Sequence, residues 1–333
     1  MPKVSFSYLL HLTDDNGILE HCILTTPDPS EGYSTDDNAR ALQLSIRLGI
    51  NKVVPIYLKF LVSAHTSEGF HQDLNSDMTW DDKAEVNEGY GRAMAALGET
   101  AVSAPKEDQR QTATSIFDEE ELLIKKIKHP RVIAQTIIGL SYRMKLEKNK
   151  FEADAQFLAD KLAGSYLNSS EERWKWYEDE LTYDNGRLPL AMFSAYQCLG
   201  NKKYLDIARQ SLDFLIEETY DNTKKIFSFP GHRGWYKKGG EKAVFAQQPI
   251  EAGSMVEALV KAFEVTKERK YLTFAERAFS WYSGSNILGL SLIDQTSGGI
   301  CDGLEPEDLN PNEGAESILG YLTAKLLLDA LHI

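Results

Sequence analysis

The chain has 333 residues, of which 42% are hydrophobic and 26% are charged, and its formal net charge at pH 7 is -14. This composition predicts a packed globule. The acidic balance argues against nucleic acid or an anionic membrane surface as a partner, because both bind basic protein faces. Cys22, Cys198 and Cys301 lie far apart without metal-ligand spacing, so we expect a reducing, cytoplasmic compartment. The sequence shows no signal-peptide pattern, and we expect no membrane span.

A polar segment followed by small apolar residues marks the start of the first helix, within residues 32–42. Thr35 or Asp36 is expected to be its N-cap, since a side-chain oxygen at that position accepts a free backbone N–H. Asp37 then lies at the positive end of the helix dipole, which favours a carboxylate. Gly49 is expected to end the helix.

This arrangement of a polar segment, a helix of small residues and a second helix recurs six times, with a period of roughly 45–65 residues, as in helical repeat proteins. The expected helices span residues 35–48 and 52–64, 93–98 and 107–126, 132–144 and 150–167, 190–199 and 204–218, 254–266 and 271–281, and 318–331. Because the last repeat has a single helix, we expect segment 5–12 to be its outer partner and to close the ring. No linker rich in Pro, Gly or Ser separates the repeats. We therefore expect one all-α (α/α)6 toroid domain over residues 1–333, with the polar segments at one end.

Five stretches of the chain resemble the (α/α)6 toroids of the six-hairpin glycosidase superfamily. They are residues 32–42, 80–97, 176–190, 247–255 and 312–321. They are also similar to a bacterial domain of this type that is fused or adjacent to sugar-nucleotide glycosyltransferases and sometimes lies near mannoside phosphorylases. The resemblance covers nearly the whole chain and implies action on carbohydrate, with a glycosyltransferase encoded nearby as a partner. Toroids of this class also include sugar epimerases and lyases, so the fold alone does not determine the reaction.

The resemblance most often implies inverting glycoside hydrolysis, which needs two carboxyl groups about 6.5–9.5 Å apart. If the chain runs once around the toroid, the fourth repeat faces the first. We therefore expect Glu178 or Asp179 to be the proton donor. Glu313 or Asp37 is expected to position the attacking water, and Asp82 is the reserve choice. The alternative for each of these acids is a helix cap or a solvated surface charge.

The polar segments also carry the residues expected to bind sugar, because carboxylates, amides and arginines suit hydroxyl groups and aromatic rings suit the apolar face of a sugar. These residues are Asp36, Asn38, Arg40, Trp80, Asp81, Glu88, Tyr183, Asn185, Arg187, His232, Arg233, Trp235, Gln248, Glu251, Asp302 and Glu316. The alternative is capping for the helix-start acids, and an ordered surface loop for residues 80–82 and 232–235. No His or Cys cluster has ligand spacing, so we expect neither a metal nor a cofactor.

These observations predict a carbohydrate-active enzyme, a hydrolase of oligo- or polysaccharides made of neutral hexoses. Two alternatives stay open. A sugar epimerase or isomerase would use a histidine as base, and such chemistry is expected at His232. A non-catalytic glycan-binding module would work with a separate glycosyltransferase.

Overall fold

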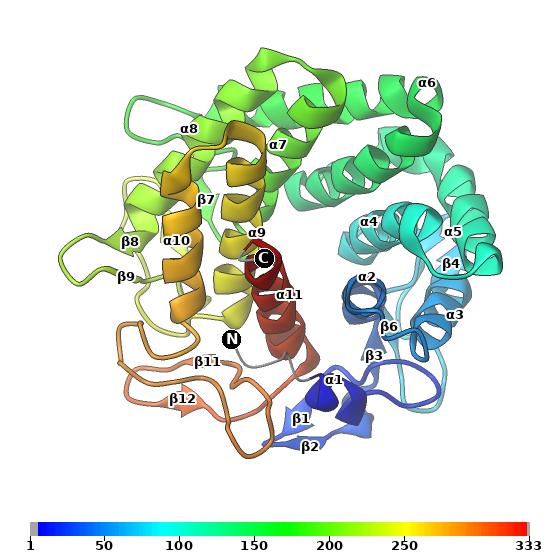
Figure 1. The fold of residues 1–333 in the computed structure, drawn as a ribbon, viewed down its shortest axis with the longest axis horizontal. Coiled ribbons are helices and arrows are strands. Elements are labelled where there is room, and N and C mark those ends of the chain that lie inside the picture. The colour runs from blue at the N-terminus through cyan, green and yellow to red at the C-terminus, as the bar shows by residue number, and fades with distance from the viewer. Residues whose placement is uncertain (1–5, 332–333) are drawn as a thin grey trace.

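Six helical segments surround a common axis within residues 6–331, the part of the chain that this computed structural model describes (Figure 1). They are α2 (Thr35–Leu48), α4 (Glu88–Ser103), the first half of α6 (Pro130–Ser169), α7 (Arg187–Leu199), α9 (Pro249–Thr266) and α11 (Ala315–Leu331). Each contacts its two neighbours, and α11 contacts α2, so the ring is closed. The predicted all-α (α/α)6 toroid is confirmed.

The remaining helices form an outer layer around this ring (Figure 1). They are α1 (Ser7–His11), α3 (Val54–Ala64), α5 (Glu107–Glu120), the second half of α6, α8 (Lys202–Thr219) and α10 (Arg269–Ser280). A 3-10 helix, Glu121–Lys126, continues α5. The two helices expected within α6 are joined by a kink at Glu147, whose φ of -135° and ψ of 63° are not helical. α1 contacts α11, as expected for the segment that completes the sixth repeat.

The inner helices are built from small residues, which let their backbones approach closely. All residues of α4 from 89 to 101 are buried. At the contact with α6, Gly139 lies so close to α4 that an added Cβ would be 2.3 Å from the Met94 carbonyl oxygen. The outer helices are amphipathic instead, and α10 buries one face only.

The N-cap of the first inner helix lies one residue before Thr35, the earlier of the two expected caps. Ser34 is the N-cap, and its Oγ accepts the backbone N–H of Asp37 at 3.1 Å. Thr35 is not the cap, because its hydroxyl donates to the His71 carbonyl at 2.6 Å. Gly49 ends the helix in the left-handed conformation with φ of 69°, as predicted.

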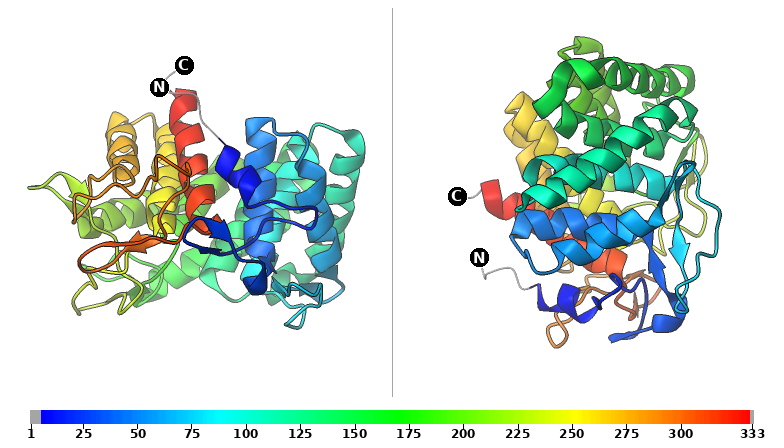
Figure 2. Two further views of the ribbon diagram at one scale, coloured as in Figure 1. Left: turned by 90° about the horizontal axis from the view of Figure 1, so that it is seen from below. Right: turned by 90° about the vertical axis from the view of Figure 1, so that its right-hand side faces the viewer.

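Short antiparallel strand pairs gather at one end of the toroid, where the inner helices begin (Figure 2). Within residues 6–331 there are six antiparallel pairs of two-residue strands. The pairs are β1 (Cys22–Ile23) with β2 (Thr26–Pro27), β3 (Tyr33–Ser34) with β6 (Asp73–Leu74), β4 (His65–Thr66) with β5 (Gly69–Phe70), β7 (Glu180–Leu181) with β10 (Tyr236–Lys237), β8 (Tyr220–Asp221) with β9 (Ile226–Phe227), and β11 (Gly303–Leu304) with β12 (Leu309–Asn310). The sequence pattern does not indicate these strands, because two residues are too few to show strand alternation. We call this end the strand end.

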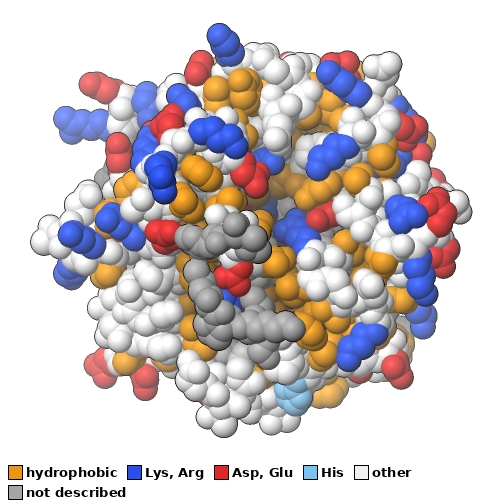
Figure 3. All heavy atoms as spheres, viewed as in Figure 1, with side chains coloured by type: hydrophobic (Ala, Val, Ile, Leu, Met, Phe, Trp, Pro, Cys, Tyr) orange, Lys and Arg blue, Asp and Glu red, His pale blue; other side chains and the backbone are white. Residues whose placement is uncertain are grey.

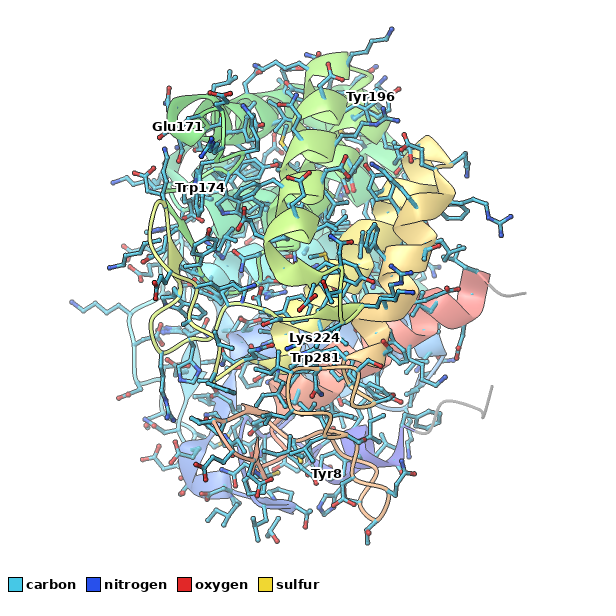
Figure 4. All side chains as sticks on the ribbon, turned by 90° about the vertical axis from the view of Figure 1, so that its left-hand side faces the viewer. Tyr8, Glu171, Trp174, Tyr196, Lys224 and Trp281 are labelled. Carbon is cyan, nitrogen blue, oxygen red and sulfur yellow. The ribbon has the colours of Figure 1, made fainter. Side chains whose placement is uncertain are left out.

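Buried tryptophans attach the strand-end loops to the outer helices. The Trp174 ring lies 5.1 Å from that of Phe214 in α8 and 5.4 Å from that of Tyr236 in β10 (Figure 4). Trp281, which follows α10, packs 5.9 Å from Phe229 (Figure 4). These rings belong to the core, so their faces are not available for stacking on a sugar.

The opposite end of the toroid is formed by the C-terminal ends of the inner helices. Figure 3 views this helix end, which is hollowed near its centre. No helix in the described part of the chain combines the length and apolar character needed to cross a membrane.

The close approach of α4 and α6 can be tested at Gly139. We expect Gly139→Ala to lower the free energy of unfolding by about 1–3 kcal/mol, because the new Cβ would overlap backbone atoms of α4. Gly164→Ala is the matched control in the same helix. No atom lies within 4 Å of its added Cβ, and it should stabilise by up to about 1 kcal/mol through helix propensity. Urea unfolding that ranked the two variants the other way would contradict this packing.

Candidate active site

A cavity of about 470 Å³ opens at the strand end, above the first turns of α2 and α11. Its lining carries six carboxyl groups, two histidines and one arginine. They are Glu20, Asp36, Asp37, Asp302, Glu305, Glu316, His21, His232 and Arg40. We call this space the acidic cavity.

The start of α2 places two adjacent carboxylates and an arginine at the cavity wall. Asp37 is buried, and its Oδ1 lies 2.9 Å from Arg40 Nη2 while its Oδ2 accepts the Ser34 hydroxyl at 3.0 Å. Asp36 Oδ1 lies 3.1 Å from Arg40 Nε. Arg40 also reaches Glu316 of α11 at 3.3 Å. This arginine therefore joins the first and last inner helices at the point of ring closure.

A buried ion-pair network crosses the toroid axis below the cavity. Arg92 of α4 pairs with Asp36 at 2.9 Å and with Asp184 at 2.7 Å. Arg187 of α7 pairs with Asp184 at 3.3 Å and with Glu257 of α9 at 2.8 Å. Burial opposes ionisation of Asp184, but the charges of Arg187 and Arg92 outweigh it and hold the pKa of Asp184 below its usual value. The network thus links four inner helices through ion pairs that are largely buried from solvent.

Gln135 of α6 completes this network. When its amide is oriented with the oxygen toward the arginines, that oxygen accepts from Arg92 Nη1 at 2.7 Å and from Arg187 Nε at 3.1 Å. The space remaining beside the network is a void of about 30 Å³. The acidic cavity therefore has a polar floor that separates it from the helix end.

Burial changes the proton affinity of the carboxyls that line the acidic cavity. Burial, together with the negative charges of Asp37, Asp73 and Asp36, raises the pKa of Glu20 to about 8. Burial also raises the pKa of Asp37, against the opposing effect of Arg40. The same cause raises the pKa values of Asp302 and Glu316, which are among the groups expected to bind sugar.

Asp302 and Glu316 are held at the start of α11. Asp302 Oδ1 accepts the Gly314 N–H at 2.8 Å and the Ser317 hydroxyl at 2.5 Å. Glu316 keeps about a third of its side chain exposed beside Arg40. Gln248 precedes α9 and also lines the cavity.

A second polar cluster lies at the starts of α4, α6, α7 and α9, outside the lining of the acidic cavity. Arg131 donates to Glu178 at 2.8 Å, and its guanidinium lies 4.5 Å from the centre of the Tyr183 ring. The Tyr183 hydroxyl bonds to Glu88. Burial, with the charge of Asp36, raises the pKa of Glu88 to about 7. Tyr183 and Glu88, which were both expected to bind sugar, therefore form a hydrogen bond with each other.

Asn185 and Glu251 form a buried pair in this second cluster. Asn185 Nδ2 donates to Glu251 Oε2 at 2.8 Å. Burial raises the pKa of Glu251 to about 8. Glu251 is thus held among protein groups rather than at the wall of the acidic cavity.

The expected pairing of acids across the barrel mouth is not formed. The Asp179 side chain is 79% exposed and lies 3.4 Å from Lys238 on the outer surface, and Glu178 is paired with Arg131. The buried Glu313 carboxyl accepts the Ser297 hydroxyl at 2.7 Å and does not line the cavity. Of the acids proposed as donor or base, only Asp37 lines the acidic cavity.

The segment 80–82 also lies outside the cavity lining. The Trp80 ring stacks on His71 with 5.0 Å between centroids, so it packs against protein. Asp82 accepts the Gln72 N–H at 2.8 Å and lies 3.3 Å from His71 Nδ1. Asp81 is exposed. This segment closes the loop before α4 rather than presenting a stacking surface to the cavity.

Two other expected ligands contribute to local structure. Asn38 is buried, and its side chain bonds to the Ile18 N–H at 3.0 Å and to the Ser34 carbonyl at 2.8 Å. Arg233 is 68% exposed and pairs with Glu305 at 3.2 Å.

His232 lies at the rim of the acidic cavity. Its Nδ1 is 3.1 Å from the Ala246 carbonyl oxygen, so Nδ1 carries the hydrogen in this contact. In the neutral tautomer with the hydrogen on Nδ1, the lone pair is on Nε2. The ring of Trp235 lies 6.2 Å from that of Tyr183 and 6.3 Å from that of His232.

Sequence reasoning missed Glu20, His21, Arg92 and Asp184. Arg92 lies one helical turn after Glu88, so the two side chains share one face of the helix. This spacing could have predicted that Arg92 points toward the toroid axis. Glu20 and His21 follow a turn without any pattern that marks a site. Their position depends on contacts of the Glu20 backbone, whose N–H donates to the Gly32 carbonyl and whose carbonyl accepts the Ala315 N–H at 2.9 Å.

Within residues 6–331, no group of three or more His, Cys, Asp or Glu side chains is arranged to hold a metal ion. Carboxyls with different proton affinity in one cavity are suited to paired acid and base work.

No family model matches the sequence, and no curated protein matches it. Solved structures do share its fold. A D-mannose isomerase superposes with a TM-score of 0.74 at 12% identity, over 98% of this chain and 94% of that chain. Cellobiose 2-epimerase from Bacillus thermoamylovorans gives 0.73 at 13% identity, over 98% and 95%. A GH76 α-mannanase from Bacteroides thetaiotaomicron gives 0.69 at 12% identity, over 98% and 94%.

These neighbours show that the chain shares its (α/α)6 fold with a sugar isomerase, a sugar epimerase and an α-mannanase. At these identities they establish the fold and not the reaction.

The ion-pair network can be tested at Asp184. Asp184→Asn removes the charge that Arg92 and Arg187 share, and we expect a loss on the order of 3 kcal/mol in the free energy of unfolding, because two buried guanidinium groups lose compensation. Asp179→Asn, at an exposed acid of the same loop region, should change it by less than about 0.5 kcal/mol. Equal urea midpoints for the two variants would show that the network does not support the fold.

Proposed function

We propose that this protein is a carbohydrate-active enzyme, a glycoside hydrolase whose active site is the acidic cavity. One observation carries the proposal: Glu20, whose pKa burial and neighbouring carboxylates raise to about 8, shares a cavity with Asp37, which lies 2.9 Å from Arg40. Glycoside hydrolysis requires such a division between an acid and a carboxylate.

Glu20 is suited to be the proton donor. Its side chain is about one third exposed, so it can contact a substrate while most of it stays buried. Its backbone is bonded to the segments just before α2 and α11, which limits its movement. Glu20 therefore takes the role that the sequence analysis expected of Glu178 or Asp179.

Asp37 is suited to be the partner carboxylate. Arg40 at 2.9 Å favours its ionised form and opposes the rise in pKa that burial causes, and the Ser34 hydroxyl orients its second oxygen. The negative charge of Asp37 in turn helps to keep Glu20 protonated. In this proposal Asp37 keeps its expected role of positioning the attacking water. Its partner is Glu20 in place of Glu178 or Asp179.

The proton-donor role can be tested with Glu20→Gln. New reducing ends would be measured from a panel of α- and β-linked glucans and mannans. We expect the variant to lose about 10²–10⁴-fold in rate, with an unchanged melting temperature. In the parent protein the rate should fall as pH rises through about 8, because Glu20 then loses the proton it must donate.

Asp179→Asn is the matched control, because Asp179 lies on the outer surface, and it should keep parental turnover. Undiminished turnover in Glu20→Gln, on a substrate that the parent cleaves, would rule out Glu20 as the donor.

A second candidate, a sugar epimerase or isomerase, is favoured by the orientation of His232. The Ala246 carbonyl fixes Nδ1 as the protonated nitrogen and leaves Nε2 available as a base at the cavity rim. Solved structures of a D-mannose isomerase and a cellobiose 2-epimerase share the fold.

The two chemistries are distinguished by free sugars. If the protein is an epimerase or isomerase, D-mannose or cellobiose should be converted without new reducing ends, and His232→Asn should reduce this conversion by about 10²-fold or more. Hydrolysis that survives in His232→Asn supports the first proposal. Glycan binding without turnover in either assay supports a module that works with a glycosyltransferase, the partner proposed from the sequence resemblance.

A further inference from the structure

A second cavity, of about 700 Å³, lies at the helix end of the toroid, on the other side of the ion-pair network (Figure 3). Every inner helix contributes to its wall. Arg187 and Glu257, which pair at 2.8 Å, separate it from the acidic cavity. Its volume falls within the range of about 300–1,000 Å³ typical of ligand pockets. We call it the basic cavity.

The charge of this cavity is opposite to that of the chain. Its lining has five cationic and three anionic side chains, whereas the chain has a formal net charge of -14. Arg47 is matched by Glu99 at 2.6 Å, and Arg187 by Glu257. The positive excess therefore comes from the lysines.

The three lysines of the lining lack close carboxylate partners. Lys261 Nζ is 3.6 Å from Glu264, and Lys148 Nζ is 3.8 Å from Glu152, both longer than a charge-assisted hydrogen bond. Lys145 lies 4.3 Å from the centre of the Tyr142 ring and has no ion pair within residues 6–331. Burial lowers the pKa of Lys261, which shows that its ammonium is incompletely compensated there.

Neutral polar groups lie beside these lysines. Gln197 accepts from Lys261 at 2.8 Å. The hydroxyls of Ser141 and Ser194 donate to carbonyls of their own helices at 2.7 and 2.9 Å, which leaves their oxygens free to accept further bonds. The wall thus offers cations for an anionic group and acceptors for hydroxyl groups.

We propose that the basic cavity binds a phosphorylated monosaccharide, with its phosphate at Lys145, Lys148 and Lys261 and its hydroxyl groups at Ser141 and Ser194. This site is separate from the acidic cavity and does not depend on the function proposed for it. Ammonium groups without close partners gain most from a phosphate, because each can form a charge-assisted hydrogen bond.

One competing explanation follows from helix electrostatics. The inner helices end here, and their exposed carbonyl groups carry partial negative charge that attracts lysines without any ligand. The two explanations differ in outcome, since helix-end complementation predicts no saturable ligand binding.

Binding to the full chain would be measured by isothermal titration calorimetry with mannose 6-phosphate and glucose 6-phosphate, and with inorganic phosphate and unphosphorylated mannose for comparison. We expect one-to-one binding of a sugar phosphate that weakens with salt. The double variant Lys145→Gln, Lys261→Gln should bind the sugar phosphate at least about 10-fold more weakly, because one or more charge-assisted hydrogen bonds are lost. Lys237→Gln, at an exposed lysine of the strand end, is the matched control and should bind as the parent does.

Melting temperatures of all variants would confirm that they fold. Absence of saturable binding by either sugar phosphate would overturn the proposal, as would parental affinity in the double lysine variant. Inorganic phosphate that binds as tightly as the sugar phosphates would overturn the assignment of a sugar. Glu20→Gln should keep full affinity, so failure of the hydrolase proposal and failure of this one are distinguishable.

Discussion

The interaction on which the rest of the structure depends is the buried chain of ion pairs across the toroid axis. Inner helices made of small residues leave a central space, and here arginines and carboxylates fill it. Arg92 links Asp36 and Asp184, and Arg187 links Asp184 and Glu257. Buried charges are costly to desolvate and are tolerated only when each has its partner. The network therefore requires α2, α4, α7 and α9 to keep their positions around the axis.

This constraint also creates the two cavities and separates their chemistry. Toward the strand end, carboxyls outnumber cations, and burial together with neighbouring negative charge raises the pKa of Glu20 to about 8. Toward the helix end, lysines outnumber their close partners. A single polar floor thus separates a cavity suited to proton transfer from one suited to binding an anion.

The sequence predicted part of the acidic cavity. Asp36, Asp37 and Arg40 line it because they occupy the first turns of an inner helix, whose start the sequence predicted although Ser34, and not Thr35 or Asp36, is the cap. Glu178 and Asp179 do not line it, because Glu178 pairs with Arg131 and the Asp179 side chain extends into solvent. Glu313 and Glu316 lie three positions apart, but α11 begins only at Ala315, so helical spacing does not place Glu313 beside Glu316.

By itself, the sequence determined the helical repeats, their order and the end at which the polar segments lie. Those features follow from periodicity, caps and stop residues, which act over a few residues of chain. The tertiary structure alone decided which acids share a cavity. Arg40 meets Glu316 across 276 positions of sequence, and the position of Glu20 between the starts of α2 and α11 depends on ring closure. Because pKa values depend on such distant neighbours and on burial, the proposal of Glu20 as the acid needed the folded toroid.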